Sequence, residues 1–87
     1  MKIVFSSQFK IQFISIINYI SKDKKTAALN FKNELQFKIS QLPTFPKMYR
    51  KSNYADNENI RDLIFKGYTI VYKKKKNELL ILDIFKW

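Results

Sequence analysis

The sequence predicts a single α+β domain, with helices in its first half and an antiparallel sheet in its second. The 87 residues are enough for one domain, spanning 1–87, and too few for two. Hydrophobic residues make up 46% of the chain, so a folded core is expected rather than disorder. Apolar residues recur at helical spacing in the first half and alternate at strand spacing in the second.

A short strand and a helix are expected first. Residues 2–5 are predicted to form the strand, and the Ser6–Ser7 pair can cap a helix over residues 7–21. The apolar face of this helix comprises Phe9, Phe13, Ile16, Ile17 and Ile20. Because Ile11 and Ile14 fall outside that stripe, they either meet a second layer or lie exposed.

A second helix is expected after a short polar connection, in which Asp23 can serve as the N-cap. Its apolar stripe comprises Ala28, Phe31, Leu35, Ile39 and Leu42. Pro43 ends it, because proline lacks the amide hydrogen that a helix interior needs. The two stripes and the short connection predict an antiparallel helical hairpin.

Three antiparallel strands are expected after an irregular segment at residues 43–59. The strands span residues 60–66, 68–74 and 78–86. The last strand is apolar on both sides, with Leu80, Leu82 and Ile84 on one face and Leu79, Ile81 and Phe85 on the other. Since the helices can cover only one face of the sheet, a partner is expected to cover the other.

The chain carries 17 basic and 7 acidic residues, a net charge of +10. Such a charge attracts polyanions and acidic proteins. Fifteen of the basic residues are lysines, however, which a lysine-rich proteome would also produce. The two arginines, Arg50 and Arg61, are therefore the more informative cations.

Several classes of chemistry find no support in the composition. The chain has neither cysteine nor histidine, so thiol nucleophiles and the commonest general base are excluded. The carboxylates are scattered and no glycine-rich phosphate loop is present, so neither a metal nor a cofactor is expected. No apolar stretch is long enough to span a membrane and no signal peptide is evident, so a cytoplasmic protein is expected.

Basic and aromatic residues are the candidates for contact with a target or polyanion. The segment at residues 43–59 is long for a loop in so small a domain, and such loops are usually functional. Arg61 projects from the first sheet strand on an apolar face, where a charge needs a partner. The full set comprises Tyr49, Arg50, Lys51, Arg61, Lys66, Lys86 and Trp87. A nuclease would have to use these residues and Tyr68 to stabilise charge and move protons.

The ordered set of residues resembles the RelE/ParE superfamily of toxins from type II toxin–antitoxin systems, over nearly the whole chain. The resemblance rests on Tyr19-Ile20, Asp23, Ala27-Ala28, Phe31, Leu35, Ile39, Leu42, Pro46 and Arg50, then Ile60–Leu63, Gly67–Tyr72 and Leu80–Ile84. It implies a toxin that a cognate antitoxin wraps and neutralises in a hetero-oligomer. The antitoxin would then supply the cover that the apolar surface lacks, contacting Ile11, Ile14, Leu79, Ile81 and Phe85.

The resemblance is closer to the ParE branch, whose members poison DNA gyrase, than to the RelE branch, whose members cut mRNA on the ribosome. RelE-like toxins carry an arginine after the Gly-Tyr of the middle strand, where this chain has Thr69. The Ala27-Ala28 pair and the Arg61-Asp62-Leu63 element resemble ParE instead. The resemblance therefore implies a plasmid-stabilisation toxin that inhibits gyrase without chemistry of its own. The alternatives are a RelE-like ribosome-dependent mRNA endoribonuclease and a degenerate toxin that binds only its antitoxin.

Overall fold

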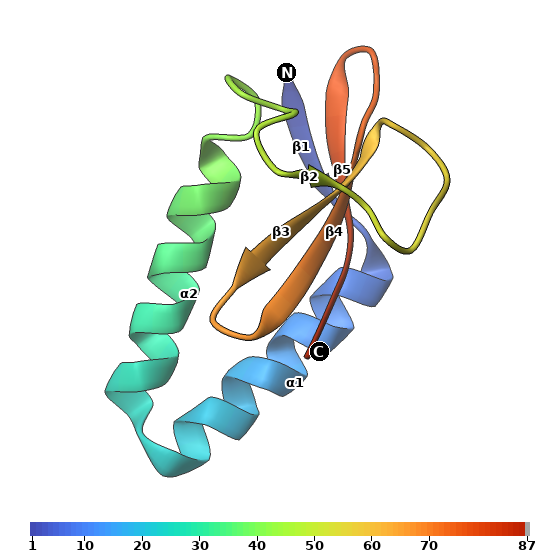
Figure 1. The fold of residues 1–87 in the computed structure, drawn as a ribbon. Helices are drawn as coiled ribbons and strands as arrows, with labels where there is room; N and C mark the ends of the chain where they lie inside the picture. Colours follow the sequence, from blue (N-terminus) through green and yellow to red (C-terminus); the bar gives the residue numbers. More distant parts are fainter. Residues whose placement is uncertain (87) are drawn as a thin grey trace.

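Two helices lie on one face of a five-stranded mixed sheet in the computed structural model, which describes residues 1–86 (Figure 1). The elements are β1 (Lys2–Phe5), α1 (Ser7–Asp23), α2 (Lys25–Ser40), β2 (Arg50–Lys51), β3 (Ile60–Phe65), β4 (Tyr68–Lys74) and β5 (Glu78–Lys86). The strand order is β1-β5-β4-β3-β2. The predicted α+β class is confirmed. Neither helix is long and apolar enough to cross a membrane.

The helical hairpin forms as predicted, but its connection is shorter. Ser6 caps α1, because its Oγ accepts a hydrogen bond from the Phe9 amide at 3.0 Å. Asp23, predicted to cap the second helix, is instead the last residue of α1. Lys24 alone separates the helices, in an extended conformation with φ −157°. Its amide donates to Ile20 and its carbonyl accepts from Ala28, so one residue makes the whole turn.

The sheet has two strands more than the predicted three-stranded unit. β1 joins it in parallel beside the first half of β5, with Lys2 opposite Glu78. β2 lies inside the segment predicted to be irregular and pairs Arg50 with Asp62 of β3. Two residues carry no readable alternation, which is why β2 is invisible in the sequence pattern.

A bulge in β5 changes which of its residues face the helices. Tyr72 pairs with Ile81 but Val71 pairs with Asp83, so Leu82 is an extra residue. As a result, Leu79, Ile81 and Ile84 all enter the core. The predicted assignment of Ile84 and Phe85 to the two faces is wrong, because the extra residue reverses the alternation at this point. The Leu82 carbonyl accepts a hydrogen bond from the Ser6 hydroxyl at 2.6 Å.

The far face of the sheet is covered in part by the chain itself. The Asn53 amide donates to the Asp62 carboxylate at 3.2 Å, and the ring of Tyr54 meets that of Phe85 edge-on at 5.1 Å. Asp62 and Thr69 are consequently buried on this face. The expectation that only a partner could cover the second face is therefore wrong here, since the segment after β2 does so.

Candidate functional site

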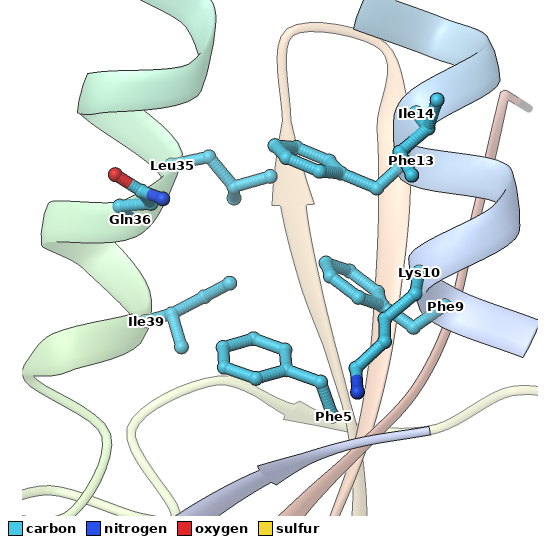
Figure 2. A pocket seen from close by; sticks show the side chains of 8 residues that line it. All are labelled: Phe5, Phe9, Lys10, Phe13, Ile14, Leu35, Gln36 and Ile39. Carbon is cyan, nitrogen blue, oxygen red and sulfur yellow. The ribbon is translucent and has the colours of Figure 1, made fainter. Parts of the chain in front are cut away.

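An apolar groove opens between α1 and α2 at the end remote from their connection. The helices diverge from Lys24, as Figure 1 shows, and side chains from both line the space between them. The groove has a volume of about 270 Å³. Its lining consists of Phe5, Phe9, Phe13, Ile14, Leu35 and Ile39, with Lys10 and Gln36 as the polar members (Figure 2).

The groove is built from residues at intervals of four, which is one helical turn for those on α1 and α2, while Phe5 lies at the end of β1. Phe5, Phe9 and Phe13 follow each other at intervals of four, with 5.4 Å between the centroids of successive rings. Leu35 and Ile39 repeat the same spacing on α2 and point across the groove toward the aromatic rings (Figure 2). The floor is buried while the rim is open, since Leu35 is fully buried and Ile14 is 60% exposed. Such a lining accepts apolar side chains and disfavours charged ones.

Ile11 and Ile14 both lie exposed, which resolves the two alternatives left open by the sequence. Ile14 borders the groove, and Ile11 lies one turn away on the same helix. A volume of 270 Å³ exceeds the roughly 150 Å³ apolar cavity that holds a benzene ring in an engineered protein. The groove is thus large enough for apolar side chains of a partner.

Leu79 and Ile81 do not belong to any surface, and their predicted contact with an antitoxin is wrong for the folded domain. Both are fully buried beneath the helices, because the inward face of β5 forms part of the core. Phe85 is half-buried on the other face, where Tyr54 packs against it. Of the five predicted antitoxin contacts, only Ile11 and Ile14 are mainly exposed.

Arg61 anchors the cationic loop, the segment from Lys47 to Glu58. Its Nε donates to the Glu58 carbonyl at 2.8 Å and its Nη1 to the Tyr49 carbonyl at 3.3 Å. The side chain is only 12% exposed. Arg61 therefore satisfies its need for partners within the domain and positions the loop, rather than presenting a free charge to a target.

Arg50 and Lys51 are, with Lys47, the cations that the cationic loop exposes to solvent. Arg50 is half-exposed while its Nη2 lies 3.5 Å from an oxygen of the fully buried Asp62 carboxylate. Lys51 lies 3.5 Å from Asp56, a fully exposed carboxylate, so this pair contributes little to stability. Both cations remain available to an anionic partner.

Tyr72 is a positioning residue that the sequence did not single out. Its hydroxyl donates to the Pro46 carbonyl at 2.9 Å, just before the cationic loop begins. Burial raises the pKa of Tyr72 to about 12, an effect that the nearby Arg61 charge partly offsets. The phenol is therefore a neutral donor at physiological pH. The sequence feature that could have identified Tyr72 is its place on the inward face of a central strand, because a buried hydroxyl needs a hydrogen-bond partner.

The remaining predicted target contacts lie at the opposite end of β3. Lys66 is in the β3–β4 turn, with its Nζ 3.3 Å from Glu34, and Lys86 is exposed near the end of β5. Trp87 lies outside the described residues. The members of the predicted set within residues 1–86 thus form two separate groups, one on the cationic loop and one beside the β3–β4 turn. Residues 1–86 contain no group of three metal-ligating side chains.

Comparison with known proteins adds a family and a fold. Residues 3–86 match the sequence profile of the family described as ParE toxin of type II toxin–antitoxin system, parDE. A solved structure described as a chromosomal ParDE TA system from P. aeruginosa is similar with a TM-score of 0.77 and 15% sequence identity. The similarity covers 99% of this chain and 95% of that one, and at this identity it shows the fold alone. No curated protein sequence matches the chain.

Proposed function

The chain belongs to the ParE toxin family of type II toxin–antitoxin systems, and on that basis we propose that it inhibits DNA gyrase and is neutralised by a cognate antitoxin. The observation that carries the proposal is the apolar groove between α1 and α2, open to solvent beside the exposed Ile14. Each Å² of such apolar surface that a partner removes from water stabilises the complex by about 25 cal/mol.

The charge of the domain favours an acidic partner for this groove. Lys10 is the single ionisable residue in the lining, and the chain as a whole carries +10. A segment that places apolar side chains in the groove and carboxylates against the surrounding lysines would match both features. An antitoxin with an amphipathic, acidic segment meets these requirements.

Two exposed residues of similar size test the groove. Ile14→Glu places a carboxylate at the rim of the groove, where an apolar segment of the partner would have to remove it from water even with Lys10 one turn away, so antitoxin binding is expected to weaken at least tenfold. Leu29→Glu, on α2 and outside the groove lining, is the matched control and should bind normally. Titration calorimetry with the antitoxin from the neighbouring reading frame measures both. Equal loss in the two variants would place the antitoxin elsewhere.

The target surface is proposed to be the cationic loop, with Arg50 and Lys51 as contacts that Arg61 and Tyr49 position. Lys51 and Lys66 form a matched pair for testing this, because each side chain is 52% exposed and joined to one carboxylate. Lys51→Ala is expected to weaken inhibition of supercoiling by purified gyrase, whereas Lys66→Ala should not. The reverse result would assign the target to the group of Lys66 and Lys86.

The gyrase assay also separates the inhibitor from the ribonuclease alternative. Thr69 stands where the resemblance leads one to expect a ribonuclease arginine, and it is fully buried. This supports an inhibitor, because that position offers neither charge nor access. If excess protein neither inhibits supercoiling nor traps cleaved DNA, gyrase is not the target. Cleavage of ribosome-bound mRNA would then support the RelE-like alternative.

A further inference from the structure

A concentration of lysines at the end of the β4–β5 hairpin plays no part in the groove or the cationic loop. We call Lys2 together with Lys73–Lys76 the lysine tip. Lys2 lies next to the hairpin because β1 pairs with β5 and the Lys2 amide donates to the Asn77 carbonyl at 3.1 Å. Glu78 is the carboxylate that accompanies it, 3.9 Å from the Lys75 ammonium. The hairpin projects beyond the neighbouring strands in Figure 1, and Lys75 and Lys76 are exposed.

Local structure does not explain this concentration of charge. Lys73 and Lys74 stand opposite Leu80 and Leu79 on β5, so neither has a carboxylate as its cross-strand neighbour, and the partly exposed pair of Lys75 with Glu78 contributes little. The other lysine-rich site, at the connection between the helices, is different. There Lys22 occupies the last turn of α1, where the helix dipole favours a cation, and Asp23 adjoins it.

We propose that the lysine tip binds the phosphate backbone of duplex DNA. Lys73 and Lys74 are the last residues of β4, and Lys75 and Lys76 lie in the turn that follows, so four cations are carried at one end of the hairpin, where several can contact the phosphates of one duplex. The sequence from Lys73 to Glu78 contains no aromatic residue, so the tip lacks the stacking platform that single-stranded nucleic acids require. Lysine acts as a point charge, and contacts to phosphate carry no base information, so the proposed binding is independent of base sequence.

This contact goes beyond gyrase inhibition and does not depend on it. A toxin with its own affinity for DNA is concentrated on the molecule where a DNA enzyme works, whether or not that enzyme is its target. The groove and the lysine tip involve different residues, so antitoxin binding and DNA binding can be measured separately on the same variants.

Two variants of equal charge test the proposal by fluorescence anisotropy with a labelled 20-base-pair duplex and the full chain. One replaces Lys73, Lys74, Lys75 and Lys76 with Gln, and the other replaces Lys22, Lys24, Lys25 and Lys32 with Gln. The first is expected to weaken DNA binding at least tenfold at about 0.1 M salt, and to make the plot of log K against log salt shallower by about 3. The second should change each quantity far less.

Restoring the charge with four arginines at residues 73–76 should restore binding. Equal loss in the two glutamine variants would show that net charge alone drives binding and would overturn the proposal, as would absence of DNA binding by the unaltered chain. Duplex RNA and single-stranded DNA are run in parallel, and tighter binding to either would also overturn it. Thermal unfolding and antitoxin binding of each variant confirm that the fold is intact. Loss of DNA binding with intact gyrase inhibition separates this proposal from the preceding one.

Discussion

Arg61 shows how one side chain can organise an irregular segment of the chain. Its guanidinium binds carbonyl oxygens at Tyr49 and Glu58, which lie toward the two ends of the cationic loop. Arg50 and Lys51 lie between these two points. The geometry of the exposed cations therefore depends on a cation that is itself almost buried.

Replacing Arg61 is expected to destabilise the domain as well as to disorganise the loop. Arg61→Ala leaves two carbonyl groups without their charged donor, which predicts a loss of about 1–3 kcal/mol in the free energy of unfolding. Arg61→Lys should recover little of this, because one ammonium group cannot reproduce the fork of the guanidinium. Urea denaturation measures both. Normal stability in Arg61→Ala, combined with lost gyrase inhibition, would instead make Arg61 a direct target contact.

Tyr72 makes the stability of the domain depend on pH in the alkaline range. Its pKa is raised from 10 to about 12, so between these values the unfolded chain loses the phenolic proton while the folded chain keeps it. Stability from this group is thus complete below pH 10 and falls as the pH rises, by up to about 1.4 kcal/mol per pH unit.

Tyr72→Phe isolates that effect. At pH 8 the variant should be less stable than the original by about 1 kcal/mol, because the hydrogen bond to Pro46 is lost. The difference should shrink and then reverse as the pH approaches 11.5, since phenylalanine does not ionise. Urea denaturation measures the free energy of unfolding of both proteins at each pH. A difference between them that stays constant from pH 8 to 11.5 would contradict the assigned pKa.

Among the elements, the helices and the three long strands follow from residue periodicity, and they are the parts that the sequence predicts well. β2 is too short to carry a pattern, and the bulge at Leu82 is hidden because β5 is apolar on both faces. A strand of this kind gives no contrast by which a change of face can be detected. The wrong assignment of Leu79 and Ile81 to a surface follows from this same absence of contrast.

The site was predictable only in part, for a different reason. The cations around Arg50 can be named from the sequence, but the partners of Arg61 are backbone carbonyls, which no residue pattern identifies. The groove depends on the divergence of two helices, which is a property of packing rather than of either helix alone. Candidate residues can therefore be named from the sequence, whereas their grouping needs the fold.

Ser6 joins three elements and is the best point at which to test the β1–α1 junction. Its Oγ accepts from the Phe9 amide and donates to the bulged Leu82 carbonyl. Ser6→Ala is expected to lower the free energy of unfolding by about 1–2 kcal/mol. Ser7→Ala is the control, since Ser7 is already inside α1 and does not cap it. Equal effects of the two substitutions would show that the cap and the bulge contact contribute nothing specific.

The whole molecule combines a small core with apolar surface on its helices. A domain of this size buries a modest fraction of its surface on folding, so it is marginally stable alone. Large apolar residues are nevertheless exposed on both helices, among them Ile11, Ile14, Tyr19, Leu29 and Phe37. A partner that covers part of this surface adds its binding free energy to the stability of the fold.

Saturation with antitoxin is therefore expected to raise the midpoint of thermal unfolding by roughly 10 °C or more. The estimate follows from about 2.7 kcal/mol at a partner concentration of 100 Kd, and from a shift of about 4–8 °C per kcal/mol for a small domain. Differential scanning fluorimetry measures it, with Ile14→Glu as the variant that should show a much smaller shift. An unchanged midpoint in the presence of a bound antitoxin would contradict the coupling.

The single residue between the two helices has a mechanical consequence. α1 and α2 contain 17 and 16 residues, so each is a rigid arm about 25 Å long that meets the other at Lys24. A change of 10° in the angle between the arms displaces their far ends by about 4 Å, which is more than half the pitch of a helix. The distance across the groove between Phe9 and Ile39, near the far ends of the two arms, is therefore sensitive to the backbone torsions of Lys24, where the arms meet.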